Sequence, residues 1–423
     1  MIVPSSSPPR VQKYKGANGI TILQQDNPGS RAFCMGVWVN TGSRDEKPGE
    51  EGLCHFLEHT VFKGTRNRSA FEISQAIEKV GGALEAFTTK EQICVYTQVL
   101  DEHKALAAEV LGDMILHSTY PAEQIALEKK VVLEEIRDVM DAPDDLIHEL
   151  FAREIYPGHP LGRPILGRAE TVSRFGRSKL LRFAAKQFRA DNMVISVVGN
   201  IGKQPLMQLC DWAFRLPTGG GNRRTPRLRK YRPVRKHHRR KLHHQHICVG
   251  ARSYSYLDER RYSLMVLTTL LGGSMSSRLF QRIREELGYT YSIYTYADPA
   301  RDSGLLGTYF AVKPANVGKV IREVLREFDK IKAGEVGADE LEVTKEQLKG
   351  RILLGLETSA SKMMRVAQNE ICFGRQISEQ ELIANITRVS MDDLIETASE
   401  VLDVGNTTIV SLGPSSAGLG AGA

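Results

Sequence analysis

GLCHFLEHTVFKG, residues 52–64, contains two sets of residues at helical spacing. Apolar residues predict one buried helix face, formed by Leu53, Phe56, Leu57 and Val61. The opposite face carries His55, Glu58 and His59. Because side chains four residues apart project from the same side of a helix, both imidazoles can reach one metal ion at about 2.0–2.1 Å. The stretch therefore predicts an amphipathic helix with a metal-binding face.

A third metal ligand is expected elsewhere in the chain, because a catalytic zinc ion takes three protein ligands and one open position. Residues 123–140, EQIALEKKVVLEEIRDVM, predict a second helix. Glu128 and Glu135 lie one heptad apart and share a face, whereas Glu134 points about 100° away. We predict Glu135 as the third ligand. A His-x-x-Glu-His pattern on an ordinary solvated helix is the competing interpretation, since short motifs also occur by chance.

The rest of the chain predicts an α+β fold of two domains. At 423 residues it exceeds the roughly 250–300 residues of a single core. Helical patterns alternate with β-rich runs such as those at 92–100 and 193–199, which favours sheets packed with helices. The two halves show a faint duplication, between 34–46 and 248–259. We predict domains at 1–216 and 245–414, a basic linker at 217–244 and a flexible tail at 415–423.

Composition excludes several classes of protein. A hydrophobic content of 41% and a charged content of 25% are typical of globular chains. The six cysteines form no Cys-x-x-Cys pair, which argues against a disulfide framework and a thiolate zinc site and favours a reducing compartment. No run approaches the ~18–20 apolar residues of a membrane span, and the N-terminus has no apolar signal core. We therefore expect a cytoplasmic protein without a transmembrane segment.

The net charge of +7 is concentrated in one segment. Residues 222–246 hold 11 of the 57 lysines and arginines and no acidic residue, so the remaining chain carries −4. With its prolines and a preceding PTGGG, the segment is typical of a solvated connector more than of a polyanion-binding arm. Nucleic acid is not expected as a partner. His244-Gln245-His246 is interpreted as the entry to a strand, and not as a metal site.

Both predicted metal helices resemble sequences of the pitrilysin/insulinase family of zinc metallopeptidases, the inverzincins, whose motif order is the reverse of His-Glu-x-x-His. HFLEHTVFKGT (55–65) and EKKVVLEE (128–135) carry the resemblance, which is strongest to mitochondrial processing peptidase and its bacterial homologues. PDDLIHELF (143–151) and GHPLGRPILG (158–167) extend it, so that it covers most of the chain. The resemblance implies one zinc ion per chain, with the ligands His55, His59 and Glu135. It also makes Glu58 the general base and Glu128 a supporting carboxylate.

The second half resembles the same family at LLGGSMSSRLFQRIREELGYTYSIY (270–294). The resemblance implies that Arg284 and Tyr291 contact the substrate, although composition alone favours a solvated Arg284 and a half-buried Tyr291. In GGALEAFTTKE (81–91), Glu85 stands before Ala86 where the family usually has Asn on its substrate-binding edge strand. The contact of that Asn to the substrate backbone is therefore left open.

Taken together, the resemblance implies two similar lobes, each a mainly antiparallel sheet packed with helices, that form a clam-like chamber. The first domain would bind zinc, and the second would supply the Arg/Tyr pair. The expected activity is zinc-dependent endopeptidase cleavage of extended peptides or unfolded segments, by a homodimer or a heterodimer with a related subunit. A non-catalytic peptide-binding subunit and a nucleic-acid-binding module are the alternatives. The complete set of His55, Glu58, His59 and Glu135 favours the enzyme.

Overall fold

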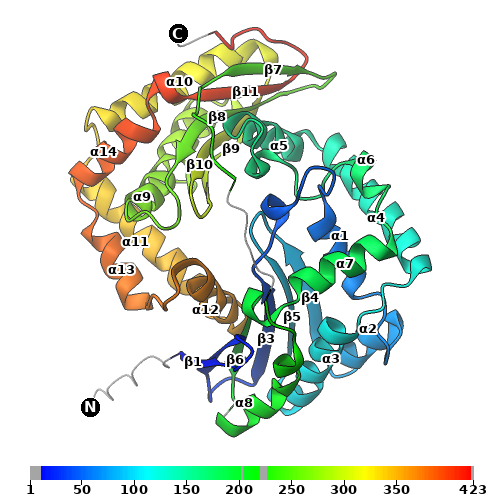
Figure 1. The fold of residues 1–423 in the computed structure, drawn as a ribbon. Helices are drawn as coiled ribbons and strands as arrows, with labels where there is room; N and C mark the ends of the chain where they lie inside the picture. The colour runs from blue at the N-terminus through cyan, green and yellow to red at the C-terminus, as the bar shows by residue number, and fades with distance from the viewer. Residues whose placement is uncertain (1–10, 202, 220–225, 421–423) are drawn as a thin grey trace, which may run out of the picture. The chain divides into compact units, whose positions relative to one another are not determined.

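The computed structural model describes residues 11–201, 203–219 and 226–420, which form two compact units (Figure 1). As far as they are described, the first unit contains Met1–Arg137, Pro164–Thr225 and Gly355–Gln376. The second contains Asp138–Arg163, Pro226–Leu354 and Ile377–Ala423. Each unit has its own sheet and helices, which confirms the predicted α+β class.

The first unit is built on a six-stranded sheet in which only β2 and β6 pair in parallel. In spatial order its strands are β1 (Gln12–Lys15), β2 (Thr21–Asp26), β6 (Met193–Gly199), β3 (Ala32–Val39), β5 (Ile93–Leu100) and β4 (Ala83–Thr88). Strand β3, AFCMGVWV, is apolar at nearly every position because both of its faces are buried. Strand β4 is an edge of the sheet.

Helices cover the two faces of this sheet. One face carries α1 (Leu53–Val61), α2 (Ala70–Glu78) and α3 (Lys104–His117), and the unit also contains α4 (Ala122–Asp141, as far as Arg137), α6 (Ala169–Val172), α7 (Arg177–Gln187) and α8 (Lys203–Leu209). Helix α12 (Ser359–Phe373) covers the other face, where Met363 packs against Trp38. Gly36 permits this packing, since a Cβ there would lie 2.5 Å from Met363 Sδ.

The second unit has a five-stranded sheet in which only β7 and β11 pair in parallel. Its strands in spatial order are β7 (Arg235–Arg239), β11 (Thr408–Gly413), β8 (Gln245–Ser253), β10 (Gly304–Val312) and β9 (Thr290–Pro299). One face packs on α5 (Pro143–Ile155). Besides short 3-10 helices, the described residues of this unit also form α9 (Arg261–Gly272), the π-helix η6 (Phe280–Glu286), α10 (Val317–Lys332), α11 (Ala338–Gly355), α13 (Glu379–Arg388) and α14 (Met391–Val401).

The faint duplication corresponds to a repeated sheet. The strand order β2-β6-β3-β5-β4 in the first unit matches β7-β11-β8-β10-β9 in the second, with the single parallel pair at the same place. Strand β7 is therefore the counterpart of β2, and Arg235–Arg239 of the predicted linker are sheet residues. Of the remaining linker, 220–225 lies outside the described residues, as do 421–423 of the predicted tail.

Each compact unit includes one helix that comes from the other half of the sequence. Helix α5 follows α4 in the first half but covers the sheet of the second unit, and α12 lies in the second half but covers the sheet of the first. The predicted domains at 1–216 and 245–414 are continuous in sequence and so differ from these units. The physical reason for this arrangement is that each sheet has two apolar faces, and both must be covered by helices.

None of the helices in the described part of the chain is long and apolar enough to span a membrane.

Candidate metal centre

The N-terminus of α1 is fixed by a buried carboxylate and by close backbone packing. Glu46 accepts hydrogen bonds from the backbone N–H groups of Gly52 and Cys54, at 2.9 and 2.7 Å. Gly52 and Gly167 both have positive φ, and a Cβ on Gly167 would lie 2.2 Å from the carbonyl oxygen of Glu51. The helix therefore starts at a position that the surrounding backbone determines.

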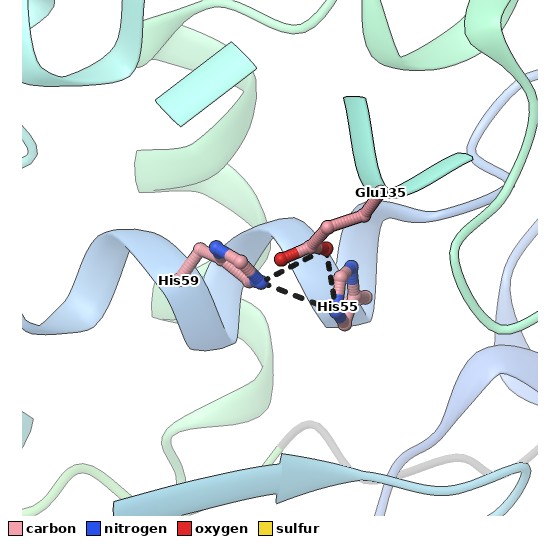
Figure 2. A group of neighbouring side chains, drawn as sticks. All are labelled: His55, His59 and Glu135. Carbon is pink, nitrogen blue, oxygen red and sulfur yellow. Dashed lines mark hydrogen bonds and ion pairs between the residues drawn. The ribbon is translucent and has the colours of Figure 1, made fainter. Parts of the chain in front are cut away.

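Three side chains from α1 and α4 turn their donor atoms toward one point, as Figure 2 shows. His55 Nε2 and His59 Nε2 are 3.2 Å apart, and Glu135 Oε2 lies 3.7 and 3.5 Å from them. Two ligand atoms that each lie about 2.0–2.1 Å from a tetrahedral zinc ion are about 3.3–3.4 Å from each other. The three measured separations are close to this distance, so the three atoms could bind one zinc ion. Among the described residues, this is the one group of His, Cys, Asp and Glu that could share a metal ion.

A carboxylate orients one of the two histidines, and burial keeps the other neutral. Glu128 Oε2 lies 3.1 Å from His59 Nδ1, and Lys63 Nζ lies 2.8 Å from Glu128 Oε1. With its proton on Nδ1, His59 donates to Glu128 and keeps the Nε2 lone pair directed at the other ligands. Burial, and then the nearby charge of His59, lower the pKa of His55 to about 3, so His55 stays neutral. Its buried Nδ1 has no hydrogen-bond partner in the described part of the chain.

Glu58 projects from the same helix and is tied to the edge of the sheet. Its carboxylate accepts a hydrogen bond of 2.5 Å from the Thr88 hydroxyl at the end of β4. Burial raises the pKa of Glu58, which the Thr88 hydrogen bond partly offsets, and the charges of His59 and Glu135 also act on it. A carboxylate with a raised pKa beside metal-ligand side chains is suited to proton transfer. Sequence reasoning missed Thr88, because its proximity to α1 arises only in the folded sheet.

The predicted substrate strand is the free edge of the first sheet, and its side chains alternate between the two faces. Ala86 packs on the core beneath α1. Glu85 is exposed on the opposite face, where its carboxylate accepts a hydrogen bond from the Tyr96 hydroxyl. The acidic side chain is therefore next to the edge but not on the α1 face of the sheet.

Arg284 and Tyr291 belong to the second unit, whereas the predicted metal ligands belong to the first. The guanidinium of Arg284 lies 4.4 Å from the ring centroid of Phe280 and 5.0 Å from that of Tyr291. The helix-turn-strand segment thus brings the two predicted residues together. Tyr291 is 85% exposed, so it is not the half-buried packing residue that composition favours.

Two family descriptions match the chain in succession. Residues 21–169 match insulinase (peptidase family M16), and residues 174–348 match the peptidase M16 inactive domain. Bacillus subtilis YmxG, named an uncharacterized zinc protease, is 38% identical over 90% of this chain and 93% of its own. A Streptomyces coelicolor protein of the same description is 37% identical over 91% and 85%.

Two solved structures share the fold. A protease from Helicobacter pylori superposes with a TM-score of 0.90 at 19% identity, over 96% of this chain and 100% of its own. A peptidase M16 inactive domain from Pseudomonas fluorescens also reaches 0.90, at 18% identity, over 96% and 98%. At these identities the likeness concerns the fold alone.

Proposed function

The chain belongs to the insulinase family, peptidase family M16, and from this premise we propose that it is a zinc-dependent endopeptidase. The observation that carries the proposal is the convergence of His55, His59 and Glu135, with Glu58 projecting from the same helix. Two nitrogen donors and one carboxylate oxygen are a zinc-ligand set of hydrolytic enzymes. Relatives named as zinc proteases support the same conclusion.

The proposed chemistry is hydrolysis of a peptide bond with Glu58 as the general base. One zinc ion per chain, when bound, supplies Lewis acidity that lowers the pKa of a water toward about 7. Glu58 accepts a proton from the attacking water, whose oxygen adds to the peptide carbonyl carbon. When the C–N bond breaks, Glu58 returns that proton to the leaving amine. Glu128 supports the site by orienting His59 through its Nδ1.

The proposed substrate is an extended peptide or an unfolded protein segment. The free edge of β4, with Glu85 and Ala86, presents backbone groups to which such a segment can add as a further strand. These hydrogen bonds depend little on the substrate sequence. Arg284 and Tyr291 are proposed to contact the same substrate from the second half of the chain, and a homodimer or a heterodimer with a related subunit is the proposed assembly.

A non-catalytic peptide-binding subunit is the second candidate. The match of residues 174–348 to a domain described as inactive favours it. The complete set of ligand-type residues and the neighbouring Glu58 favour catalysis, because a subunit that only binds peptides has no use for them. Metal-dependent turnover distinguishes the two candidates.

We expect about one zinc ion per purified chain and peptide cleavage that is lost with a chelator. Zinc content should be measured alongside the hydrolysis of an unfolded protein, before and after chelation. Restoration of activity by added zinc is the control for damage during metal removal. Undiminished cleavage by a preparation with verified metal loss would exclude the zinc mechanism.

A further inference from the structure

Strand β9, which carries Tyr291, contains a bulge at that residue. Thr290 pairs with Val312 and Ile293 pairs with Phe310 of β10. Two residues of β9, Tyr291 and Ser292, therefore lie opposite the single residue Ala311. Such bulges reorient the side chains of the strand that carries the extra residue.

The bulge decides which way Tyr291 points. Side chains of a regular strand alternate, so Tyr291 would share a face with Ile293, which is 4% exposed and packs in the core of the second unit. The extra residue shifts this alternation by one position. Tyr291 is 85% exposed in consequence, beside the guanidinium of Arg284.

A buried hydroxyl holds the bulge. Thr290 is 8% exposed, and its hydroxyl donates toward the carbonyl oxygens of Ala311 and Ser292, at 2.7 and 2.8 Å. The same oxygen accepts a hydrogen bond of 3.2 Å from the backbone N–H of Ser292. The Thr290 hydroxyl thus connects backbone groups of β9 and β10 on both sides of the bulge.

The remainder of β9 is anchored by a histidine of α5. His148 Nδ1 lies 2.8 Å from the Tyr296 hydroxyl, and His148 Nε2 lies 2.8 Å from the Tyr294 hydroxyl. In the neutral ring, one nitrogen donates and the other accepts, so both tyrosines are satisfied together. Because β9 is an edge strand and β10 is its single partner among the described strands, these contacts add a second restraint on its position.

We propose that Thr290 and His148 are positioning residues for Tyr291: Thr290 locks the bulge that turns the ring outward, and His148 fixes the strand that carries it. This inference rests on the proposed function, in which Tyr291 contacts the substrate. Neither residue touches the substrate itself. Their effect on turnover passes through the placement of the Tyr291 hydroxyl.

Thr290→Val tests the lock, since it keeps the branched shape and removes only the hydroxyl. We expect backbone amides 291–293 to exchange with deuterium about tenfold faster, because one hydrogen-bonding group is lost. We also expect kcat to fall about tenfold or more with KM nearly unchanged, because small displacements of a catalytic contact are costly. Thr290→Ser, which retains the hydroxyl, should restore both quantities to near wild-type values.

His148→Phe tests the second anchor, with His246→Phe as its matched control. His246 makes a comparable hydrogen bond of 3.0 Å to Tyr309 on the same sheet, but does not hold β9 through a hydroxyl. We expect His148→Phe to lower kcat and speed exchange along β9, and His246→Phe to change thermal stability without either effect. Equal kinetic losses in the two variants would reduce His148 to a structural role.

The role of Thr290 would be contradicted if Thr290→Val left amide exchange and kcat unchanged. It would also be contradicted if Thr290→Val and Thr290→Ser changed these two quantities equally. Tyr291→Phe distinguishes a failure of this proposal from a failure of the proposed function, in which Tyr291 contacts the substrate. If Tyr291→Phe turned over at the wild-type rate, the substrate role of Tyr291 would be wrong, and with it the kinetic part of this inference. Amide exchange would still decide whether Thr290 holds the bulge, because it needs neither metal nor substrate.

Discussion

Thr88 donates a hydrogen bond to Glu58 from the edge strand, and this contact makes Glu58→Gln an informative substitution. The glutamine oxygen can still accept from Thr88, so the geometry is kept while the ability to accept a proton from water is lost. We expect zinc content to be unchanged and kcat to fall by about 10²–10⁴-fold. Glu134→Gln, on the exposed face of α4, is the control. A Glu58→Gln variant near the wild-type rate would show that another group is the base.

Glu85 gives a second prediction at the residue scale, about sequence preference. Its exposed carboxylate beside the β4 edge should favour peptides with Lys or Arg near the cut. Solvent exposure limits this effect to about 1 kcal/mol or less, and salt should weaken it. A peptide library profiled with wild type and Glu85→Asn at two salt concentrations measures the preference, with exposed Glu123→Gln as control. Identical preferences in wild type and Glu85→Asn would discard the idea.

Helical spacing predicts that His55 and His59 share a face, and in the structure their ring nitrogens converge with the Glu135 carboxylate of α4. The shared face is predictable because one helix is a local object with a fixed period, whereas the approach of a second helix is not local. The Thr88 contact and the Tyr291 bulge cannot be predicted from local spacing. Both depend on strand pairing, which a single sequence does not define.

At the scale of elements, the start of α1 depends on two glycines packed backbone to backbone. Gly167→Ala adds a Cβ at φ +78°, against the Glu51 carbonyl, so we expect a loss of about 2 kcal/mol or more in the free energy of unfolding. Gly29→Ala, which meets nothing within 4 Å, is the matched control and should be near neutral. Thermal unfolding and zinc content measure both variants. Equal stability of the two would mean that α1 does not depend on this contact.

Some elements are well defined by the sequence and others are not. Helix α2 begins at a capping box of Ser69 and Glu72, a pattern that can be read from the sequence, and Gly81 follows its end with φ +71°. The charge of strand β7, RKHHR, is typical of solvated segments, and in the sequence it therefore predicts a linker. Its partner β11 lies about 170 residues further along, so no local signal indicates the pairing.

At the scale of the whole molecule, the prediction concerns two residues of the second half of the chain and their effect on turnover at the site proposed in the first half. Tyr291→Phe should keep zinc and fold but lower kcat by about 10²–10³-fold, because it removes the hydrogen bond that the Tyr291 hydroxyl is proposed to donate to the substrate oxygen where negative charge develops. Arg284→Ala should also raise KM, since its guanidinium packs on Tyr291 and is proposed to hold the peptide backbone. Arg282→Ala, on the same helix, controls for helix damage. Wild-type kinetics in both test variants would leave the second half a purely architectural role.

The two-part organisation follows from length and the sheet pattern, but the exchange of α5 and α12 does not. Both helices are amphipathic in sequence, and amphipathicity defines a face without defining the sheet that it covers. Trp38 and Met363 are fully buried in the same hydrophobic cluster, although they lie more than three hundred residues apart in the sequence.

Because of this separation in the sequence, the two faces of the first sheet are covered at different times during synthesis. Strand β6 completes the first sheet at Gly199, whereas α12, which covers its second face, begins only at Ser359. At about 5–20 residues per second, the ribosome needs roughly 8–32 s to make the intervening chain. During that interval Trp38 and its apolar neighbours have no permanent cover. We expect the nascent protein to be a client for chaperones that shield exposed apolar surface until α12, in about the last sixth of the chain, has been made.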